Sequence, residues 1–313
     1  MGNNNKTTFI ARIGCQSVVL FLVLIPYIYI LNFSIFPWLE SPLTTSRGVF
    51  HSMLSTLFTI LILVSYYLCK STNPGEYQDT LLPSYYLNQP VSQEDDRRFC
   101  TKCDEQKPER AHHCNICKKC VLRMEHHSMW IGNCIGLYNL KYYILFLFYS
   151  SVSIIYFLFL LVLRATQILS DNHSNNNLNN NNNYSLDITN VFISGLLVIV
   201  MVATEVSIGA TLCTQVLRLG RNITSIEQED IRKRSAKKLS NQSLMSLIRR
   251  YDKGGVYNNI ASVFGSQCIG WLLPIQSNGD IFFLRPSSSS SNGSGLDGIH
   301  SNVCLKKGDI FVV

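Results

Sequence analysis

Charged residues are scarce in this sequence. Asp, Glu, Lys and Arg make up 15% of its 313 residues, whereas hydrophobic residues make up 47%. Roughly a quarter of the residues in a soluble globular protein are charged, so this shortage argues against an ordinary soluble protein. We expect part of the chain to be surrounded by lipid.

An even spread of cysteines and a signal-peptide cleavage site are also missing. Six of the 11 cysteines fall between Cys100 and Cys134, and the other five are scattered through the rest of the chain. A secreted disulfide scaffold would be shorter, with more evenly spread cysteines. No small-residue cleavage site follows the first apolar stretch, which is therefore interpreted as a retained membrane span.

Four apolar stretches are long enough to cross a bilayer, which takes about 20 residues per helix. They cover residues 13–33, 49–69, 142–163 and 191–217. The predicted fold class is an all-α integral membrane protein with four transmembrane helices.

Lys and Arg are almost absent from two of the connecting loops. The loop between the first two spans contains only Arg47, and the loop between the last two contains none beyond Arg164 at its edge. The loop between spans two and three and the tail after span four are rich in both, as cytosolic segments are. Both termini and the cysteine-rich loop are therefore predicted to be cytosolic, a pattern that also accounts for the net charge of +7.

These assignments divide the chain into five parts. They are a cytosolic N-terminus (1–12), spans one and two (13–69), a cytosolic loop (70–141) with a cysteine-rich domain (98–148), spans three and four with an Asn-rich lumenal loop (142–217), and a cytosolic C-terminal region with a Ser-rich stretch (218–313). Sequons at Asn32, Asn172 and Asn183 fall on the lumenal side and predict a glycoprotein. This agreement is weak, because a fourth sequon at Asn222 is cytosolic.

The loop between spans two and three has the spacing of a metal site. Three C-x2-C steps occur together with four histidines: Cys100/Cys103, Cys114/Cys117 and Cys117/Cys120, with His112, His113, His126 and His127. Such steps let two thiolates reach one tetrahedral ion, and six cysteines with two histidines would fill two Cys3His sites. Buried free thiols are the alternative, but polar Lys, Glu and Asn residues surround these cysteines. We predict two structural zinc ions that replace the core a 35-residue polar segment cannot form.

The residues of this loop resemble the cysteine-rich domain of DHHC-type protein S-acyltransferases, the palmitoyltransferases. The match covers residues 98–148 and includes Lys107-Pro108-x-Arg110, His113-Cys114, Trp130, Asn133-Cys134, Gly136 and Asn139. Three further motifs are similar to those of the family: Asn73-Pro74-Gly75, Thr224-Ser225-Ile226-Glu227, and Tyr251-Asp252-x-Gly254 followed by Asn258 or Asn259 and Val263-Phe264-Gly265.

The resemblance implies how the ligands divide between the two ions. One site would consist of Cys100, Cys103, His113 and Cys120, and the other of Cys114, Cys117, His127 and Cys134. It also implies four helices around an acyl-binding cavity, with acyl-CoA (palmitoyl-CoA) as the donor. Client proteins with membrane-proximal cysteines would be the acceptors, and an endomembrane, Golgi or ER, would be the location.

The family signature Asp-His-His-Cys is altered here to Glu125-His126-His127-Ser128. In the family the cysteine becomes S-acylated, the first histidine acts as the base and the aspartate orients that histidine. The resemblance thus assigns these roles to Ser128, His126 and Glu125. Glu preserves the carboxylate, but a hydroxyl is a weaker nucleophile than a thiolate. Passing an acyl group from a serine oxoester to a client thiol would also run uphill.

Two functions from different classes remain open. The chain is an active S-acyltransferase, or it is a catalytically impaired relative that binds acyl-CoA or partner proteins. A zinc-finger nucleic-acid binder is excluded, because the loop is tethered to a membrane and has no basic recognition helix. Glu205, in the middle of span four, is a functional candidate as an intramembrane carboxylate, and contact with a Ser or Thr of another span is the alternative.

Overall fold

The structure is a computed structural model of the full chain. It describes residues 2–40, 45–76, 99–177, 188–236 and 241–275. Most of the Asn-rich run and all of the Ser-rich stretch lie outside the described residues, so their predicted properties stay predictions.

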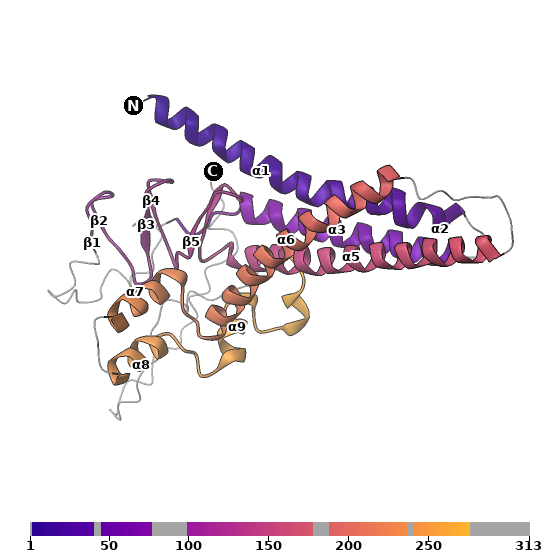
Figure 1. Ribbon diagram of the computed structural model, residues 1–313. Coiled ribbons are helices and arrows are strands. Elements are labelled where there is room, and N and C mark those ends of the chain that lie inside the picture. The colour runs from indigo at the N-terminus through magenta and orange to yellow at the C-terminus, as the bar shows by residue number, and fades with distance from the viewer. Residues whose placement is uncertain (1, 41–44, 77–98, 178–187, 237–240, 276–313) are drawn as a thin grey trace.

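Four long helical segments dominate the fold (Figure 1). The first combines α1 (Gly2–Ile30), a π-helical turn η1 (Leu31–Ile35) and α2 (Phe36–Glu40), and the others are α3 (Thr45–Ser71), α5 (Leu140–Asn177) and α6 (Ile188–Gly220). Each contains a window apolar enough to cross a membrane, within residues Ile13–Glu40, Thr45–Ser71, Leu140–Ser170 and Thr189–Gly220. The four predicted spans are therefore confirmed. The sequon residue Asn32 falls in η1, within the first of them.

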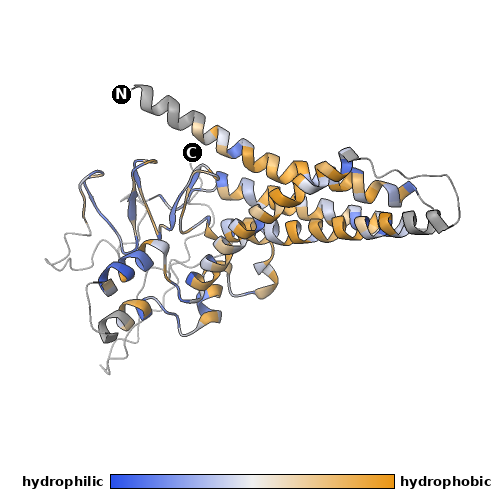
Figure 2. Ribbon diagram, in the orientation of Figure 1, coloured by the Kyte–Doolittle hydropathy of each residue, from blue (hydrophilic) through white to orange (hydrophobic). Residues whose placement is uncertain are grey.

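The helix α5 forms the centre of the bundle. It packs against α3 on one side and α6 on the other, and 61% of its apolar window is buried, compared with 6% for α6. The remaining surface of α6 is apolar and exposed (Figure 2), as expected for a helix that faces lipid.

The cysteine-rich domain is built from three short antiparallel hairpins, which the all-α prediction did not include. They pair β1 (Phe99–Cys100) with β2 (Glu105–Gln106), β3 (His112–Cys114) with β4 (Lys119–Val121), and β5 (His126–Ser128) with β6 (Asn133–Ile135). In the first two hairpins a C-x2-C step makes the turn, and the next residue, Asp104 or Lys118, has a positive φ. The mostly helical fold class holds, with strands confined to this domain.

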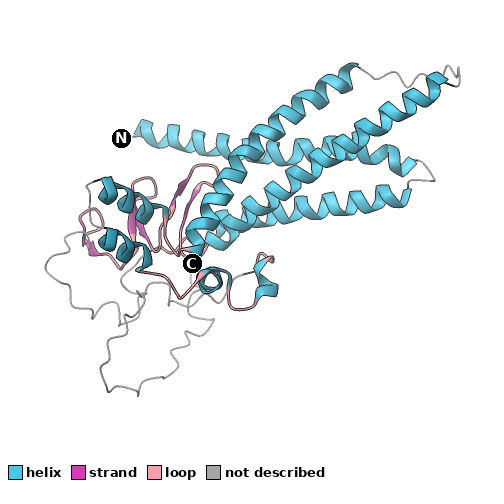
Figure 3. Cartoon of the chain, turned by 60° about the horizontal axis from the view of Figure 1, so that its bottom comes forward, coloured by secondary structure: helices cyan, strands magenta, loops and turns pink. Residues whose placement is uncertain are grey.

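The C-terminal region covers the end of the bundle nearest the hairpins. It contains α7 (Ser225–Ala236), α8 (Asn241–Arg249), α9 (Val256–Phe264) and a 3-10 turn η4 (Cys268–Trp271). Figure 3 shows α7 and α8 beside the hairpins, and α9 contacts both α5 and α6. The described part of the cysteine-rich domain and the C-terminal helices thus lie side by side at the same end of the bundle.

Candidate functional site

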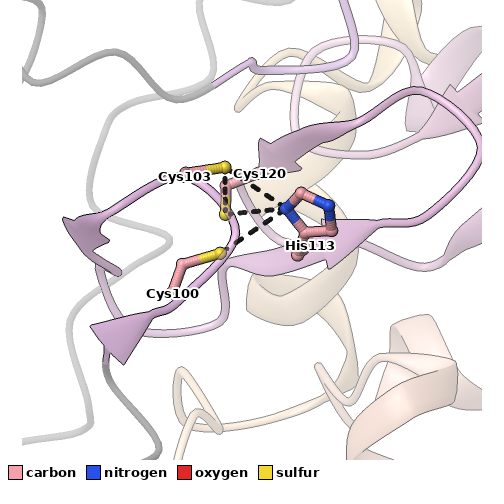
Figure 4. Close-up of side chains that lie close together, drawn as sticks. All are labelled: Cys100, Cys103, His113 and Cys120. Carbon is pink, nitrogen blue, oxygen red and sulfur yellow. Dashed lines mark hydrogen bonds between the residues drawn. The ribbon is translucent and has the colours of Figure 1, made fainter.

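The first group of metal-ligand residues joins the first two hairpins. Cys100, Cys103, His113 and Cys120 place their ligand atoms within 4.8 Å of one another (Figure 4). Nδ1 of His113 lies 3.5 Å from Sγ of Cys100 and 3.2 Å from Sγ of Cys103. The sulfur atoms of Cys103 and Cys120 are 3.8 Å apart.

The second group joins the second and third hairpins and consists of Cys114, Cys117, His127 and Cys134. Nδ1 of His127 lies 3.7 Å, 3.3 Å and 3.5 Å from the sulfur atoms of Cys114, Cys117 and Cys134. The structure thus brings together the same two sets of four residues that the resemblance implies. Because the sets interleave along the chain, each ion would fasten two hairpins together.

Both groups have the dimensions of a tetrahedral zinc site. Zinc binds thiolate sulfur at about 2.3 Å and imidazole nitrogen at about 2.0–2.1 Å, which places neighbouring ligand atoms of a tetrahedron about 3.6–3.8 Å apart. The separations in the first group, between 3.2 and 3.9 Å, are close to these values. The residues therefore fit two closed metal sites of the Cys3His type.

The strand β5 separates the two histidines of the altered signature. Side chains alternate between the faces of a strand, so the central His127 points toward Cys134, its partner in β6, and the metal ligands. His126 and Ser128 share the opposite face. One strand thus carries a metal ligand on one side and both candidate reacting groups on the other.

The candidate nucleophile and base have different surroundings. Ser128 is buried, and its Oγ accepts a hydrogen bond from the amide of Ile131 at 3.3 Å. The ring of His126 packs edge-on against Tyr143 of α5, with 5.5 Å between the ring centroids. Among the hydrogen bonds of the described residues, none joins His126 to Ser128.

Arg218 is a residue near this site that the sequence did not single out. It lies in the last turn of α6, and its Nε is buried without a hydrogen-bond partner among the described residues. Burial, helped by the charge of Arg218 and by His127, lowers the pKa of His126 to about 4. Its sequence pattern was indistinguishable from an ordinary basic flank after a membrane span.

Glu125 is held by the Thr-Ser-Ile-Glu motif after α6. Its Oε2 accepts a hydrogen bond from the Ser225 amide at 2.8 Å, and its backbone carbonyl accepts one from the Ser225 hydroxyl. Glu125 is almost fully buried. Two segments 100 residues apart are thus joined beside the candidate base, and the structure gives a physical reason for the motif.

Arg110 connects the cysteine-rich domain to the same motif. Its guanidinium donates to Glu227 at 2.7 Å and 2.8 Å, and to the Asn222 carbonyl at 2.9 Å, and it stacks on the Tyr251 ring at 4.2 Å. Burial raises the pKa of Glu227, but the charge and hydrogen bonds of Arg110 outweigh burial, so the net shift is downward. Glu227 is therefore ionised and paired.

The intramembrane candidate Glu205 and the motif residue Trp130 also have clear positions. Glu205 accepts a hydrogen bond from the Ser151 hydroxyl of α5 at 2.5 Å. This contact agrees with the alternative interpretation of Glu205, in which it pairs with a Ser or Thr of another span. Trp130 is exposed, and its carbonyl accepts a hydrogen bond from Tyr66 at 3.0 Å. The Trp130 ring therefore lies at the surface of the molecule.

A membrane-embedded helical bundle with a two-centre Cys3His domain between its helices defines the class of protein. Residues 93–231 match the family model described as DHHC palmitoyltransferase. The chain belongs to this family.

Similar proteins come from several eukaryotes. The chain is 42% identical over 313 residues to "Putative ZDHHC-type palmitoyltransferase 2" of Dictyostelium discoideum, covering 99% of this chain and 64% of that protein. It is 32% identical over 236 residues to "Probable protein S-acyltransferase 15" of Arabidopsis thaliana, covering 74% and 86%. It is 30% identical over 240 residues to "Palmitoyltransferase PFA3" of Candida glabrata, covering 74% and 66%. The chain thus spans just under two thirds of the length of the Dictyostelium relative.

Proposed function

We propose that this chain is a membrane-bound protein S-acyltransferase in which Ser128 takes the acyl group, His126 is the base and Glu125 orients His126. The observation that carries the proposal is that His126 and Ser128 share one face of β5, opposite the metal ligand His127. Membership of the DHHC palmitoyltransferase family supports palmitoyl-CoA as the donor and cysteines of membrane-associated proteins as the acceptors.

The proposed reaction has two acyl transfers. Ser128 Oγ attacks the thioester carbonyl of acyl-CoA, His126 takes the hydroxyl proton, and that proton passes to the departing CoA thiolate. A client thiol then attacks the acyl-serine, so that a thioester forms and the Ser128 hydroxyl is restored. The overall exchange converts one thioester into another. The acyl-serine oxoester between them is lower in free energy than either thioester. The second transfer therefore runs uphill and is slow.

The metal sites, the orientation and the location complete the proposal. Three thiolates and one imidazole are a usual ligand set for structural zinc, which supports two zinc ions. Zinc would hold the hairpins together and take no part in acyl transfer. The Lys- and Arg-rich loops support a cytosolic cysteine-rich domain with both termini on the same side. The resemblance to the family suggests a Golgi or ER membrane.

A second candidate function is that of an impaired relative that binds acyl-CoA without passing the chain on. It is favoured by the hydrogen bond from the Ile131 amide to Ser128 Oγ and by the contact of His126 with Tyr143 in place of Ser128. A serine held in this way has no base to activate it.

Acyl transfer from labelled palmitoyl-CoA by the purified chain distinguishes the two functions. The proposed acyltransferase labels itself through an oxoester, which resists mild hydroxylamine, then slowly labels a client thiol, and Ser128→Ala abolishes both signals. Self-labelling of Ser128→Cys alone, through a hydroxylamine-sensitive thioester, would instead establish the impaired relative. A wild-type signal that survives Ser128→Ala would refute the role of Ser128.

A further inference from the structure

The segment after α9 exposes apolar side chains to an unusual degree. Ile269 is 90% exposed, and Leu272, Leu273 and Ile275 are also exposed. No charged residue occurs between Lys253 and Asp280. Soluble surfaces rarely expose a contiguous apolar patch of this kind without a partner, so something apolar is expected to cover it.

Two hydrogen bonds tie this segment to the side of α5. Lys141 Nζ donates to the Gly270 carbonyl at 2.8 Å, and the Tyr149 hydroxyl donates to the Leu272 carbonyl. In Figure 1 the yellow segment after α9 lies next to α5 on the side of the helical bundle. The exposed apolar side chains are thus continuous with a membrane-spanning helix.

The position of these contacts along α5 gives the level of the segment in the membrane. Between Lys141 and Arg164, residues 142–163 contain no charge and form about 33 Å of helix, which matches a hydrocarbon core of about 30 Å. Tyr149 lies eight residues, or about 12 Å, beyond Lys141. Leu272 is therefore held beside the first turns of the apolar part of α5.

Several backbone groups of the segment have partners within the protein. Irregular backbone in a bilayer must have its polar groups satisfied within the protein. The carbonyls of Gly270 and Leu272 accept the bonds from α5, the Leu273 amide bonds to the Gly270 carbonyl at 3.3 Å, and the Trp271 indole donates to the Gly265 carbonyl at 2.8 Å. The following residue, Pro274, has no amide proton to satisfy.

We propose that residues 265–275 insert into the membrane leaflet on the side of the cysteine-rich domain, with Ile269, Leu272, Leu273 and Ile275 among the lipid acyl chains beside α5. The C-terminal region is then anchored to the bilayer by a segment that does not cross it. This inference does not depend on the activity of Ser128.

Site-specific fluorescence in lipid nanodiscs tests this anchor. In the full chain, serine replaces Cys15, Cys213, Cys268 and Cys304. An NBD label is then attached at Ile269→Cys, because the Ile269 side chain is exposed and can be replaced without disturbing the packing. The matched control is the label at Lys233→Cys on α7, where the side chain is 69% exposed. Spin-labelled lipid reports contact with acyl chains, and iodide reports contact with water.

We expect strong quenching of the label at position 269 by spin-labelled lipid, and several-fold weaker quenching by iodide than at position 233. Equal iodide quenching at both positions would overturn the proposal, because the segment would then lie in water. Protection from both quenchers would also overturn it and would indicate that another protein surface covers these side chains.

Discussion

Gly136 occupies a point where three stretches of backbone meet. The Leu122 amide bonds to the Gly75 carbonyl at 2.8 Å, and the Leu137 amide bonds to the Leu122 carbonyl at 3.1 Å. A β-carbon on Gly136 would collide with the Pro74 carbonyl oxygen and lie 3.0 Å from the Leu122 carbonyl oxygen. Both obstacles are backbone atoms, which cannot move aside as a flexible side chain can.

We expect Gly136→Ala to destabilise the folded protein by about 1–3 kcal/mol, the usual range for overpacking. Gly195→Ala in α6 is the matched control, because a β-carbon there meets nothing within 4 Å. In a helix that change should be neutral or stabilise by up to about 1 kcal/mol. Thermal unfolding of both variants in detergent measures the difference, and equal midpoints would contradict this reading of Gly136.

At the scale of elements, the hairpins of the cysteine-rich domain depend on the metal sites. Their strands are two or three residues long, and a two-stranded hairpin is marginally stable by itself. The two small core clusters here are built largely around the cysteines themselves, Cys100 and Cys120 in one, Cys114 and Cys134 in the other. Bound metal must therefore supply much of the stability of this domain.

Metal analysis of the purified chain should give two zinc ions per molecule. Cys103→Ala removes one ligand of the first group, and we expect it to lower the content to one. Cys213→Ala is the control, because Cys213 is exposed on α6 and belongs to neither group. Elemental analysis after gel filtration makes the measurement, and two ions in Cys103→Ala would argue against the ligand assignment.

The sequence predicted the parts of this fold that have a local signal. Span length is a property of a single segment, and C-x2-C spacing brings Cys100 and Cys103 together through one turn. The hairpins were missed because a strand of three residues, such as His126–Ser128, is too short for an alternating pattern to be recognised.

Contacts between distant segments could not be read from the sequence in the same way. Glu125 and Ser225 are 100 residues apart, and Arg110 and Glu227 are 117 residues apart. Their motifs could be matched to a family, but the bonds between them arise only when α6 returns beside the hairpins. Arg218 was missed for the same reason, since its closeness to His126 depends on the packing of the whole bundle.

At the scale of the whole molecule, one buried side chain fastens the C-terminal region to the end of α6. Asn259 donates to the Gly220 carbonyl at 2.7 Å and to Asp252 at 2.9 Å, and it accepts from the Lys253 amide at 2.8 Å. The sequence left Asn258 and Asn259 as equal candidates for the motif position. Asn259 is 1% exposed, whereas Asn258 is exposed and donates to the Lys253 carbonyl at 3.3 Å.

Limited trypsin digestion at Arg249, Arg250 and Lys253 should reveal this attachment. Asn259→Ala leaves the Gly220 carbonyl without its partner, which costs about 1–3 kcal/mol, and opening should then raise the cleavage rate by between about 5-fold and 160-fold. Asn258→Ala, one residue away, should be cut at nearly the wild-type rate, because it loses one exposed bond of 3.3 Å. If both variants are cut equally fast, the C-terminal region is held by its apolar contacts with α5 and α6 rather than by Asn259.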